Sequence, residues 1–414
     1  MDRNSIQGMK VLIVGMGRSG KAAAEELHKL GVEITCQDSS PAAKIGPKFV
    51  TWLEKENITR CFGHDPEDPC AFDLIVLSPG VAPGLPFLQL ARAAGVEIIG
   101  ELELAYRLGY GRYVAITGTN GKTTTTTLTG EIFERSGRLT EVVGNIGVAV
   151  ISKAMSADPE EWLIAEVSSF QLETTKEFHP EIAAILNLTP DHLNRHKTME
   201  AYGAAKAAVF RNQTEADYLV INYDDKRCYA LAEGCRSKIV PFSRREELPY
   251  GAYLKGDRLV FRSDDGTVTD LLGAGELKII GDHNVENALA AAAIAFVAGI
   301  DPAVIADTIR EFPGVEHRIE YCGGVDGVFY YNDSKGTNVD AAVIALHALQ
   351  DNILLIAGGD GKAQDFSELA RQFEGRVKAL ILLGRDADQI AAAARAEGFT
   401  NIWFEKDMNA CVKR

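Results

Sequence analysis

Cysteine is scarce in this sequence, and the cysteines that are present do not form metal-binding spacings. The 414 residues include seven Cys, scattered along the chain without a C-x-x-C pair. Disulfide-stapled secreted domains and structural zinc sites both depend on close Cys spacings. Their absence excludes these two classes and indicates reduced thiols in a cytosolic protein.

Long hydrophobic runs are also missing. The longest, residues 288–300, is rich in Ala and falls short of the roughly 20 apolar residues that a membrane-spanning helix needs. Residues 1–4 lead directly into an apolar strand pattern, without the hydrophobic segment of a signal peptide. We therefore expect a cytoplasmic protein without a membrane partner, in which residues 288–300 form a buried helix.

Positive charge is in short supply. Lys and Arg total 43 against 58 Asp and Glu, so the formal net charge is -15 at pH 7, and no basic stripe offsets it. A nucleic-acid partner is therefore not expected. Anionic small molecules would have to be held by local devices, such as helix N-termini, individual Lys and Arg side chains, or metal ions.

The strongest motif follows an apolar run. Residues 113–116 predict a buried strand, which breaks at Gly118 into the loop G-T-N-G-K-T and continues as a helix. The N–H groups and helix dipole of such a turn favour phosphate, with Lys122 at the β- and γ-phosphates and Thr123 on Mg²⁺. Ile116 stands where the usual phosphate loop has its first Gly. An ordinary Gly-rich turn with a surface Lys is the simpler alternative, but the register of Gly, Lys and Thr favours nucleotide binding.

A second Gly-rich turn lies near the N-terminus. Strand residues 10–14 lead into Gly15-Met-Gly-Arg-Ser-Gly20, a helix is predicted over residues 21–30, and Asp38 closes the next strand. This order is the fingerprint of a doubly wound dinucleotide-binding domain. NAD binding, and with it a dehydrogenase, is one interpretation. Another nucleotide-like ligand with a ribose diol is the other.

A third Gly-rich turn, residues 358–362, follows the predicted strand 353–357. Three such turns predict an anion site in each of three domains, and a reaction among several anionic substrates at a domain junction. We expect an α/β fold with a Rossmann-like domain over residues 1–110, a central P-loop ATPase-like domain with a mostly parallel sheet over residues 111–313, and a Rossmann-like domain over residues 314–414.

Three side chains of the middle region have metal-binding or catalytic chemistry. Glu166 ends a buried strand, His192 follows the next strand, and Lys206 is the sole charge on a predicted helix of small residues. A carboxylate beside a phosphate loop suits Mg²⁺, and ligands of α/β sheets collect beyond the strand ends. A solvated strand-end acid, an ordinary loop His and a surface Lys are the structural alternatives.

Taken in order, the motifs resemble those of the Mur ligase family over nearly the whole chain. They are G-T-N-G-K-T at 118–123, G-N-I-G at 144–147, S-S-F-Q-L-E at 168–173, N-D-S-K-G-T-N at 332–338 and G-G-D-G-K at 358–362. The third and fourth motifs are similar to those of the member that adds D-glutamate. The resemblance implies an ATP-dependent ligase of peptidoglycan precursor synthesis, with UDP rather than NAD at the first turn.

The resemblance also implies a reaction and its partners. ATP would phosphorylate the carboxylate of UDP-MurNAc-L-Ala to an acyl phosphate, and the amine of D-glutamate would attack it, so that catalysis is mainly positioning and charge neutralisation. The implied cofactors are ATP and Mg²⁺ at two sites. The protein is expected to be a monomer.

Individual site residues are implied by the same resemblance. The ATP contacts would be Gly118, Thr119, Asn120, Gly121, Lys122, Thr123, Thr124, Asn287, Arg318 and Asp333. The contacts to the UDP substrate would be Arg18, Ser19, Asp38, Gly80 and Asn145, and those to D-glutamate would be Lys335, Thr337 and Lys362. Lys122, Glu166, His192 and Lys206 would be catalytic. Thr123 and Glu166 would hold one Mg²⁺, and His192 and a carbamylated Lys206 would hold the second.

The chain departs from the family pattern at two places. It has Asp38-Ser39-Ser40 where the family carries Asp-Thr-Arg or similar, so one contact to uracil differs. The family also continues past the position of Arg414 with a Ser- and Phe-bearing segment that closes the amino-acid site. We therefore expect the third domain to be incomplete at its end, and this chain to couple D-glutamate poorly.

Other functions share some of these motifs. A different Mur ligase or a folylpolyglutamate synthase-like ligase would share the phosphate loop. A UDP-sugar-binding module without catalysis would share the first turn, although the complete set of phosphate and metal residues favours an enzyme.

Overall fold

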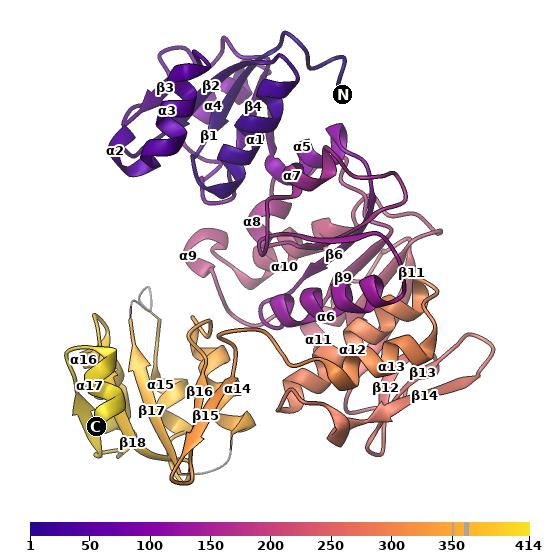
Figure 1. The fold of residues 1–414 in the computed structure, drawn as a ribbon, viewed down its shortest axis with the longest axis vertical. Helices are drawn as coiled ribbons and strands as arrows, with labels where there is room; N and C mark the ends of the chain where they lie inside the picture. The colour runs from indigo at the N-terminus through magenta and orange to yellow at the C-terminus, as the bar shows by residue number, and fades with distance from the viewer. Residues whose placement is uncertain (350–351, 360–363) are drawn as a thin grey trace. The chain divides into compact units, whose positions relative to one another are not determined.

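The computed structural model describes residues 1–349, 352–359 and 364–414, and its chain divides into two compact units (Figure 1). The first unit comprises Met1–Leu272 and Leu289–Thr308, and the second comprises Gly273–Ala288 and Ile309–Arg414. None of the helices within these ranges combines the length and hydropathy that a membrane span requires.

The first unit begins with a five-stranded parallel sheet in the order β3-β2-β1-β4-β5. The strands are β1 (Lys10–Val14), β2 (Glu33–Asp38), β3 (Thr59–Phe62), β4 (Leu74–Leu77) and β5 (Glu97–Gly100). The helices are α1 (Arg18–Lys29), α2 (Ala42–Ile45), α3 (Pro47–Lys55), α4 (Pro86–Ala93) and α5 (Glu101–Leu108). The strand order reverses between β1 and β4, and ligands of open α/β sheets bind at such a switch point.

The turn after β1 differs from the sequence prediction. Helix α1 begins at Arg18 rather than at residue 21, so Arg18 and Ser19 belong to its first turn. Gly20 permits this tight geometry, because a Cβ there would lie 2.0 Å from the carbonyl oxygen of Gly15. Asp38 Oδ2 accepts the N–H of Met16 at 2.7 Å, so the acid of the fingerprint closes the turn.

A nine-stranded sheet forms the rest of the first unit, in the order β14-β13-β12-β11-β10-β9-β6-β8-β7. Its strands are β6 (Arg112–Thr117), β7 (Thr140–Gly144), β8 (Trp162–Glu166), β9 (Ile182–Ile185), β10 (Tyr218–Asn222), β11 (Lys238–Ser243), β12 (Gly251–Lys255), β13 (Arg258–Arg262) and β14 (Val268–Gly273). Strands β6 to β12 pair in parallel, and β12 and β13 pair antiparallel. The mostly parallel central sheet is therefore confirmed.

The helices that follow these strands are α6 (Lys122–Arg135), α7 (Val150–Ala154), α8 (Ser169–Leu172), α9 (Leu193–His196), α10 (Met199–Ala207), η1 (Ala208–Phe210) and α11 (Lys226–Ala230). Further along the chain are η2 (Ala274–Glu276), α12 (Asp282–Val297) and α13 (Pro302–Glu311). Helix α12 covers residues 288–297 of the predicted apolar helix and ends three residues before its predicted end, and residues 288–295 are all fully buried.

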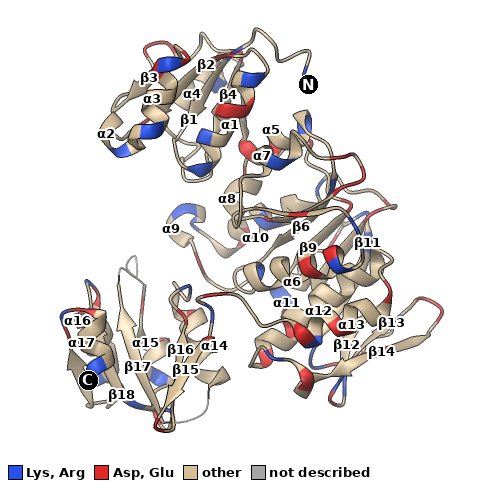
Figure 2. Cartoon of the chain, in the orientation of Figure 1, with Lys and Arg blue, Asp and Glu red and all other residues tan. Residues whose placement is uncertain are grey.

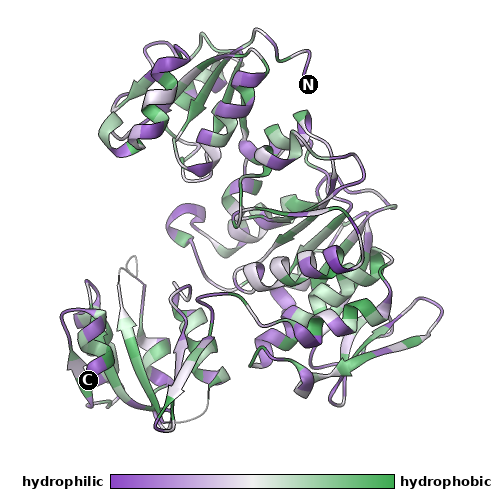
Figure 3. Cartoon of the chain, viewed as in Figure 1, coloured by the Kyte–Doolittle hydropathy of each residue, from purple (hydrophilic) through white to green (hydrophobic). Residues whose placement is uncertain are grey.

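Inner strands of both sheets have the sequences expected of strands that are buried on both faces. Strands β4 and β9 have the sequences LIVL and IAAI, continuous apolar runs of the kind that parallel strands require. They carry no charged residue in Figure 2 and are hydrophobic in Figure 3. The Thr-rich helix α6 is pale in Figure 3, yet Thr123 to Thr126 are buried, so packing stabilises a helical turn that intrinsic propensity disfavours.

The second unit contains two further sheets. Strands β15 (Glu320–Val325) and β16 (Val328–Asn332) form an antiparallel pair, and β17 (Ile353–Gly358), β18 (Val377–Leu383) and β19 (Ile402–Phe404) form a parallel sheet in that order. Its remaining helices are α14 (Val339–Ala348), α15 (Ser367–Arg371), α16 (Ala387–Ala396) and α17 (Met408–Lys413). Most of the third Gly-rich turn, including Lys362, lies outside the described residues.

A buried carboxyl joins the two sheets of the first unit. Glu101, at the start of α5, is 2 % exposed, and its Oε1 accepts the N–H of Ile151 in α7 at 2.7 Å. Burial raises the pKa of Glu101 from 4.5 to about 7. The folded chain therefore binds this proton more tightly than the unfolded chain does, and stability falls as pH rises from the unfolded pKa through the folded one.

We expect this carboxyl to give the protein a measurable pH dependence of stability. At 1.36 kcal/mol per pKa unit, Glu101 lowers the free energy of unfolding by about 3 kcal/mol between roughly pH 4 and pH 7.5. Glu101→Gln keeps an oxygen for the N–H of Ile151 and removes the titration. The difference in Tm between variant and wild type should therefore grow with pH over this interval, and a constant difference would contradict the assignment.

Candidate active site

The predicted phosphate loop is formed between β6 and α6. Gly118 has φ +155°, and Gly121, which precedes the first residue of α6, has φ +83°, a backbone region that favours glycine. Asn187, directly after β9, shapes this loop: its Oδ1 accepts the N–H of Thr119 at 3.0 Å and of Asn120 at 2.8 Å. Sequence reasoning did not assign Asn187 a role, and the only signal for it was a polar residue at a strand end.

Thr119 attaches the loop to the segment that carries His192. Its hydroxyl donates to the carbonyl oxygen of Thr189 at 3.1 Å and lies 3.3 Å from the hydroxyl of Tyr202. Lys122 Nζ lies over the same loop and donates to the carbonyl oxygens of Gly118 at 2.9 Å and Thr119 at 2.7 Å. The cation is thus held beside the backbone N–H groups that would receive a phosphate.

Thr123 and Glu166 meet as predicted for a magnesium site. The Thr123 hydroxyl donates to Glu166 Oε2 at 2.8 Å, and Asn145 Nδ2 donates to Glu166 Oε1 at 2.7 Å. Glu166 is only 2 % exposed, so it is not a solvated strand-end acid. A hydroxyl and a carboxylate beside a phosphate loop are oxygen ligands that suit Mg²⁺.

Lys206 is buried in the site rather than exposed on its helix. It is 1 % exposed, and its Nζ donates to the carbonyl oxygen of Gly118 at 2.7 Å and lies 4.5 Å from the centre of the Tyr202 ring. Burial holds the pKa of Lys206 well below its usual range, and the Lys122 ammonium lowers it further. The alternative of a surface Lys is therefore wrong.

His192 lies at the start of α9 with φ +54°, a left-handed conformation that is uncommon outside glycine. Its ring centre is 4.8 Å from that of Phe170 and 6.5 Å from that of Tyr202, the ring that Lys206 also approaches. Among the described residues there is no group of three or more His, Cys, Asp and Glu side chains that could hold a metal. A metal at His192 would therefore need at least one ligand that is not a His, Cys, Asp or Glu side chain.

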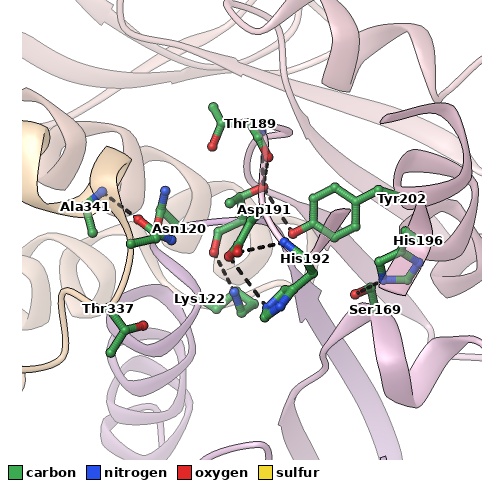
Figure 4. Close-up of polar contacts among 12 residues, drawn as sticks. Asn120, Lys122, Ser169, Thr189, Asp191, His192, His196, Tyr202, Thr337 and Ala341 are labelled. Carbon is green, nitrogen blue, oxygen red and sulfur yellow. Dashed lines mark hydrogen bonds and ion pairs between the residues drawn. The ribbon is translucent and has the colours of Figure 1, made fainter. Parts of the chain in front are cut away.

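A Ser, a His and a Glu lie in line nearby. Ser169 Oγ is 2.9 Å from His196 Nε2, and His196 Nδ1 is 3.2 Å from Glu173 Oε1 (Figure 4 shows the Ser169–His196 contact). Ser169 is 2 % exposed and His196 is 8 % exposed, so both side chains are buried. Burial lowers the pKa of His196, and the adjacent Glu173 carboxylate opposes this shift. The three residues join α8 to α9.

The residues predicted for the UDP substrate gather around the first turn and the 144–147 loop. Ser78 Oγ donates to the carbonyl oxygen of Gly15 at 2.6 Å, and Arg195 donates to the carbonyl oxygens of Pro79 and Val81, at 2.9 and 3.1 Å. These bonds fix the backbone on either side of Gly80.

In the second unit, the structure brings together Arg318 and Asp333. Asp333 Oδ1 accepts the N–H of Ile319 at 3.1 Å, and burial raises the pKa of Asp333 while the adjacent Arg318 lowers it. Arg318 Nε is buried and has no hydrogen-bond partner within the described part of the chain. Asn287 Nδ2 donates to Asn284 Oδ1 at 3.0 Å. Lys335 and Thr337 lie in the turn between β16 and α14.

Gly144 shows how closely the site is packed. Its φ is +104°, and a Cβ there would lie 2.3 Å from the carbonyl oxygen of Glu166. We expect Gly144→Ala to destabilise the protein by about 1–3 kcal/mol or more through strain and collision. Gly137→Ala is the matched control, because Gly137 has φ +82° with open space around it. Equal losses of Tm in the two variants would show that the collision with Glu166 adds nothing to the loss of stability.

Comparison with known proteins agrees with this arrangement along the chain. Residues 9–100 match the description "Mur ligase MurD-like, N-terminal domain", residues 116–295 match "Mur ligase middle domain", and residues 317–414 match "Mur ligase, glutamate ligase domain". Solved structures share the fold. MurC from Thermotoga maritima aligns with a TM-score of 0.57 and 19% identity, over 96% of this chain and 91% of that one. MurF from Acinetobacter baumannii aligns with a TM-score of 0.59 and 17% identity, over 100% and 85%.

Curated relatives are much closer in sequence. The "UDP-N-acetylmuramoylalanine--D-glutamate ligase" of Alkaliphilus metalliredigens is 43% identical over 99% of this chain and 90% of its own length. The protein of the same name from Pelotomaculum thermopropionicum is 45% identical over 97% of this chain and 88% of its own length. With such identity over almost its whole length, the chain belongs to the Mur ligase family.

Proposed function

We propose that this chain is an ATP-dependent ligase that adds D-glutamate to UDP-N-acetylmuramoyl-L-alanine in peptidoglycan precursor synthesis. The observation that carries the proposal is the 43% identity over 99% of the chain to a relative named for this reaction. The site has the matching chemistry, because a phosphate loop, Thr123 and Glu166 lie together.

The residues of the first unit account for activation of the substrate carboxylate. Lys122 and the N–H groups of the loop would hold the β- and γ-phosphates of ATP, as in other phosphoryl transfers. Thr123 and Glu166 would hold one Mg²⁺, which would supply positive charge beside the phosphates. The substrate carboxylate would take the γ-phosphoryl group with release of ADP, and the amine of D-glutamate would then attack the acyl phosphate, lose a proton and release phosphate.

Lys206 is proposed to be carbamylated. Its lowered pKa favours the neutral amine, which is the form that adds to CO₂. The neutral Nζ would form a bond to the carbon of CO₂ as one C–O π bond breaks, and would lose one proton, so a buried neutral amine would become a buried carbamate anion. With His192 this carboxylate would hold the second Mg²⁺.

The remaining assignments are proposals for the same reaction. The UDP substrate would contact Arg18, Ser19, Asp38, Gly80 and Asn145. ATP would also contact Asn287, Arg318 and Asp333, and D-glutamate would contact Lys335, Thr337 and Lys362. The buried Arg318 Nε supports its assignment, because it offers a donor to an anionic ligand. We also propose domain boundaries near residues 110 and 313, a cytoplasmic location and a monomeric state.

Phosphate release tests the proposed function. We expect ATP hydrolysis to require UDP-MurNAc-L-Ala and D-glutamate together, with one phosphate released for each amide formed. Release with UDP-MurNAc or a longer UDP-peptide instead would indicate a different member of the family. Tight binding of the UDP substrate without any phosphate release would indicate a binding module.

A further inference from the structure

Arg18 does not extend freely from the first Gly-rich turn. It is the first residue of α1, and its guanidinium donates to three carbonyl oxygens of the loop that follows β7. Nη1 bonds Gly147 at 2.8 Å, and Nη2 bonds Gly144 at 3.1 Å and Asn145 at 2.8 Å. The side chain therefore joins the five-stranded sheet to a loop of the nine-stranded sheet.

That loop is hydrogen-bonded to the proposed magnesium ligands. The Asn145 whose carbonyl oxygen accepts from Arg18 donates its Nδ2 to Glu166 Oε1 at 2.7 Å. The other oxygen of Glu166 accepts from the hydroxyl of Thr123, in the first turn of α6. An unbroken series of hydrogen bonds thus runs from Arg18 to the helix that begins at the phosphate loop.

The loop is fixed at its far end as well. The N–H of Ile151 donates to the buried carboxyl of Glu101, at the start of α5. Side chains from α1 and α5 therefore hold both ends of the segment 144–151. The orientation of Asn145 thus depends on groups that belong to the five-stranded sheet.

We propose that Arg18 is a positioning residue for the metal site, which holds the 144–147 loop so that Asn145 directs the Glu166 carboxylate toward Thr123. This inference rests on the proposed function. Because Arg18 also lies in the turn proposed for the UDP substrate, this arrangement connects that turn to the site proposed for ATP and Mg²⁺.

The geometry requires Arg rather than a cation of any kind. A guanidinium presents its donors in a fixed fork and reaches several acceptors at once, whereas an ammonium is a point charge on a flexible stem. Arg18→Lys should therefore retain the positive charge but no longer hold the 144–147 loop in a fixed position.

The test is the Mg²⁺ dependence of binding of a non-hydrolysable ATP analogue to the full chain, measured by calorimetry without UDP substrate. For Arg18→Lys we expect about a tenfold higher Mg²⁺ concentration at half-saturation, within the usual range of coupling between sites. Lys21→Ala is the control: Lys21 is also on α1, but its Nζ donates to the carbonyl oxygen of Ile45, so the Mg²⁺ dependence of this variant should equal that of wild type.

A second comparison separates positioning from a general loss of stability. If Arg18 acts through Asn145, Arg18→Lys should have no further effect on the Mg²⁺ dependence in an Asn145→Ala background. Additive effects in the double variant, or an unchanged Mg²⁺ dependence in Arg18→Lys, would overturn the inference while leaving the proposed function intact. Absence of Mg²⁺-dependent analogue binding by the wild-type protein would overturn both.

Discussion

Lys122→Ala is expected to abolish ATP turnover, with a loss of at least about a thousandfold, and to leave binding of the UDP substrate within about twofold of wild type. Lys122 is the cation held over the phosphate loop, and removing a single preorganised charge or donor from such a site costs ~10²–10³-fold or more in rate. The UDP substrate is proposed to bind at the turn after β1, which is formed by a different sheet.

The measurements are steady-state phosphate release and calorimetric titration with UDP-MurNAc-L-Ala. Lys153→Ala is a suitable control, because Lys153 forms an ion pair with Glu141 and has no place in the site. An equal loss of both ligands in Lys122→Ala would contradict separate nucleotide sites.

Lys206→Arg is expected to lose activity by about a hundredfold or more, although arginine is also a long basic side chain. A guanidinium cannot form the carbamate, and an uncompensated cation at this buried position would repel Mg²⁺ and ATP-bound metal alike. For the wild-type protein, activity should fall in CO₂-depleted buffer and return when bicarbonate is added.

Bicarbonate rescue distinguishes this account from a purely structural role for Lys206. Bicarbonate should restore activity only to proteins that carry Lys206. Lys153→Arg should therefore respond as wild type does, and Lys206→Arg should not respond. An Arg variant that retains activity would show that the carbamate is dispensable.

The general architecture could be predicted from the sequence because its signals are local. The apolar run of residues 113–116 predicted a strand, which the structure shows as part of β6, paired with β9. The start of α1 was missed by three residues, because the helix begins within the Gly-rich turn, at Arg18, rather than after it. Propensity also argued against the Thr-rich first turn of α6, and burial overrode it.

Only part of the candidate site could be predicted from the sequence. Thr123 and Glu166 were paired in advance because one follows a phosphate loop and the other ends a neighbouring strand. The contacts of Asn187, Arg18 and Glu101 join residues far apart in the chain. No periodicity or motif encodes them, since they depend on how β–α units pack against one another.

The burial of Lys206 was equally hidden. On a helix of small residues a Lys is usually solvated, and only the packing of α10 places its Nζ against Gly118.

The identity of the amino acid that triggers ATP hydrolysis tests the central claim most directly. The assay supplies ATP, Mg²⁺ and UDP-MurNAc-L-Ala, adds one amino acid at a time, and follows phosphate release together with the mass of the product. D-glutamate alone should release phosphate and yield a product heavier by one glutamyl residue. The assignment would be contradicted if D-glutamate gave no glutamyl product and phosphate were released with another amino acid or with no amino acid.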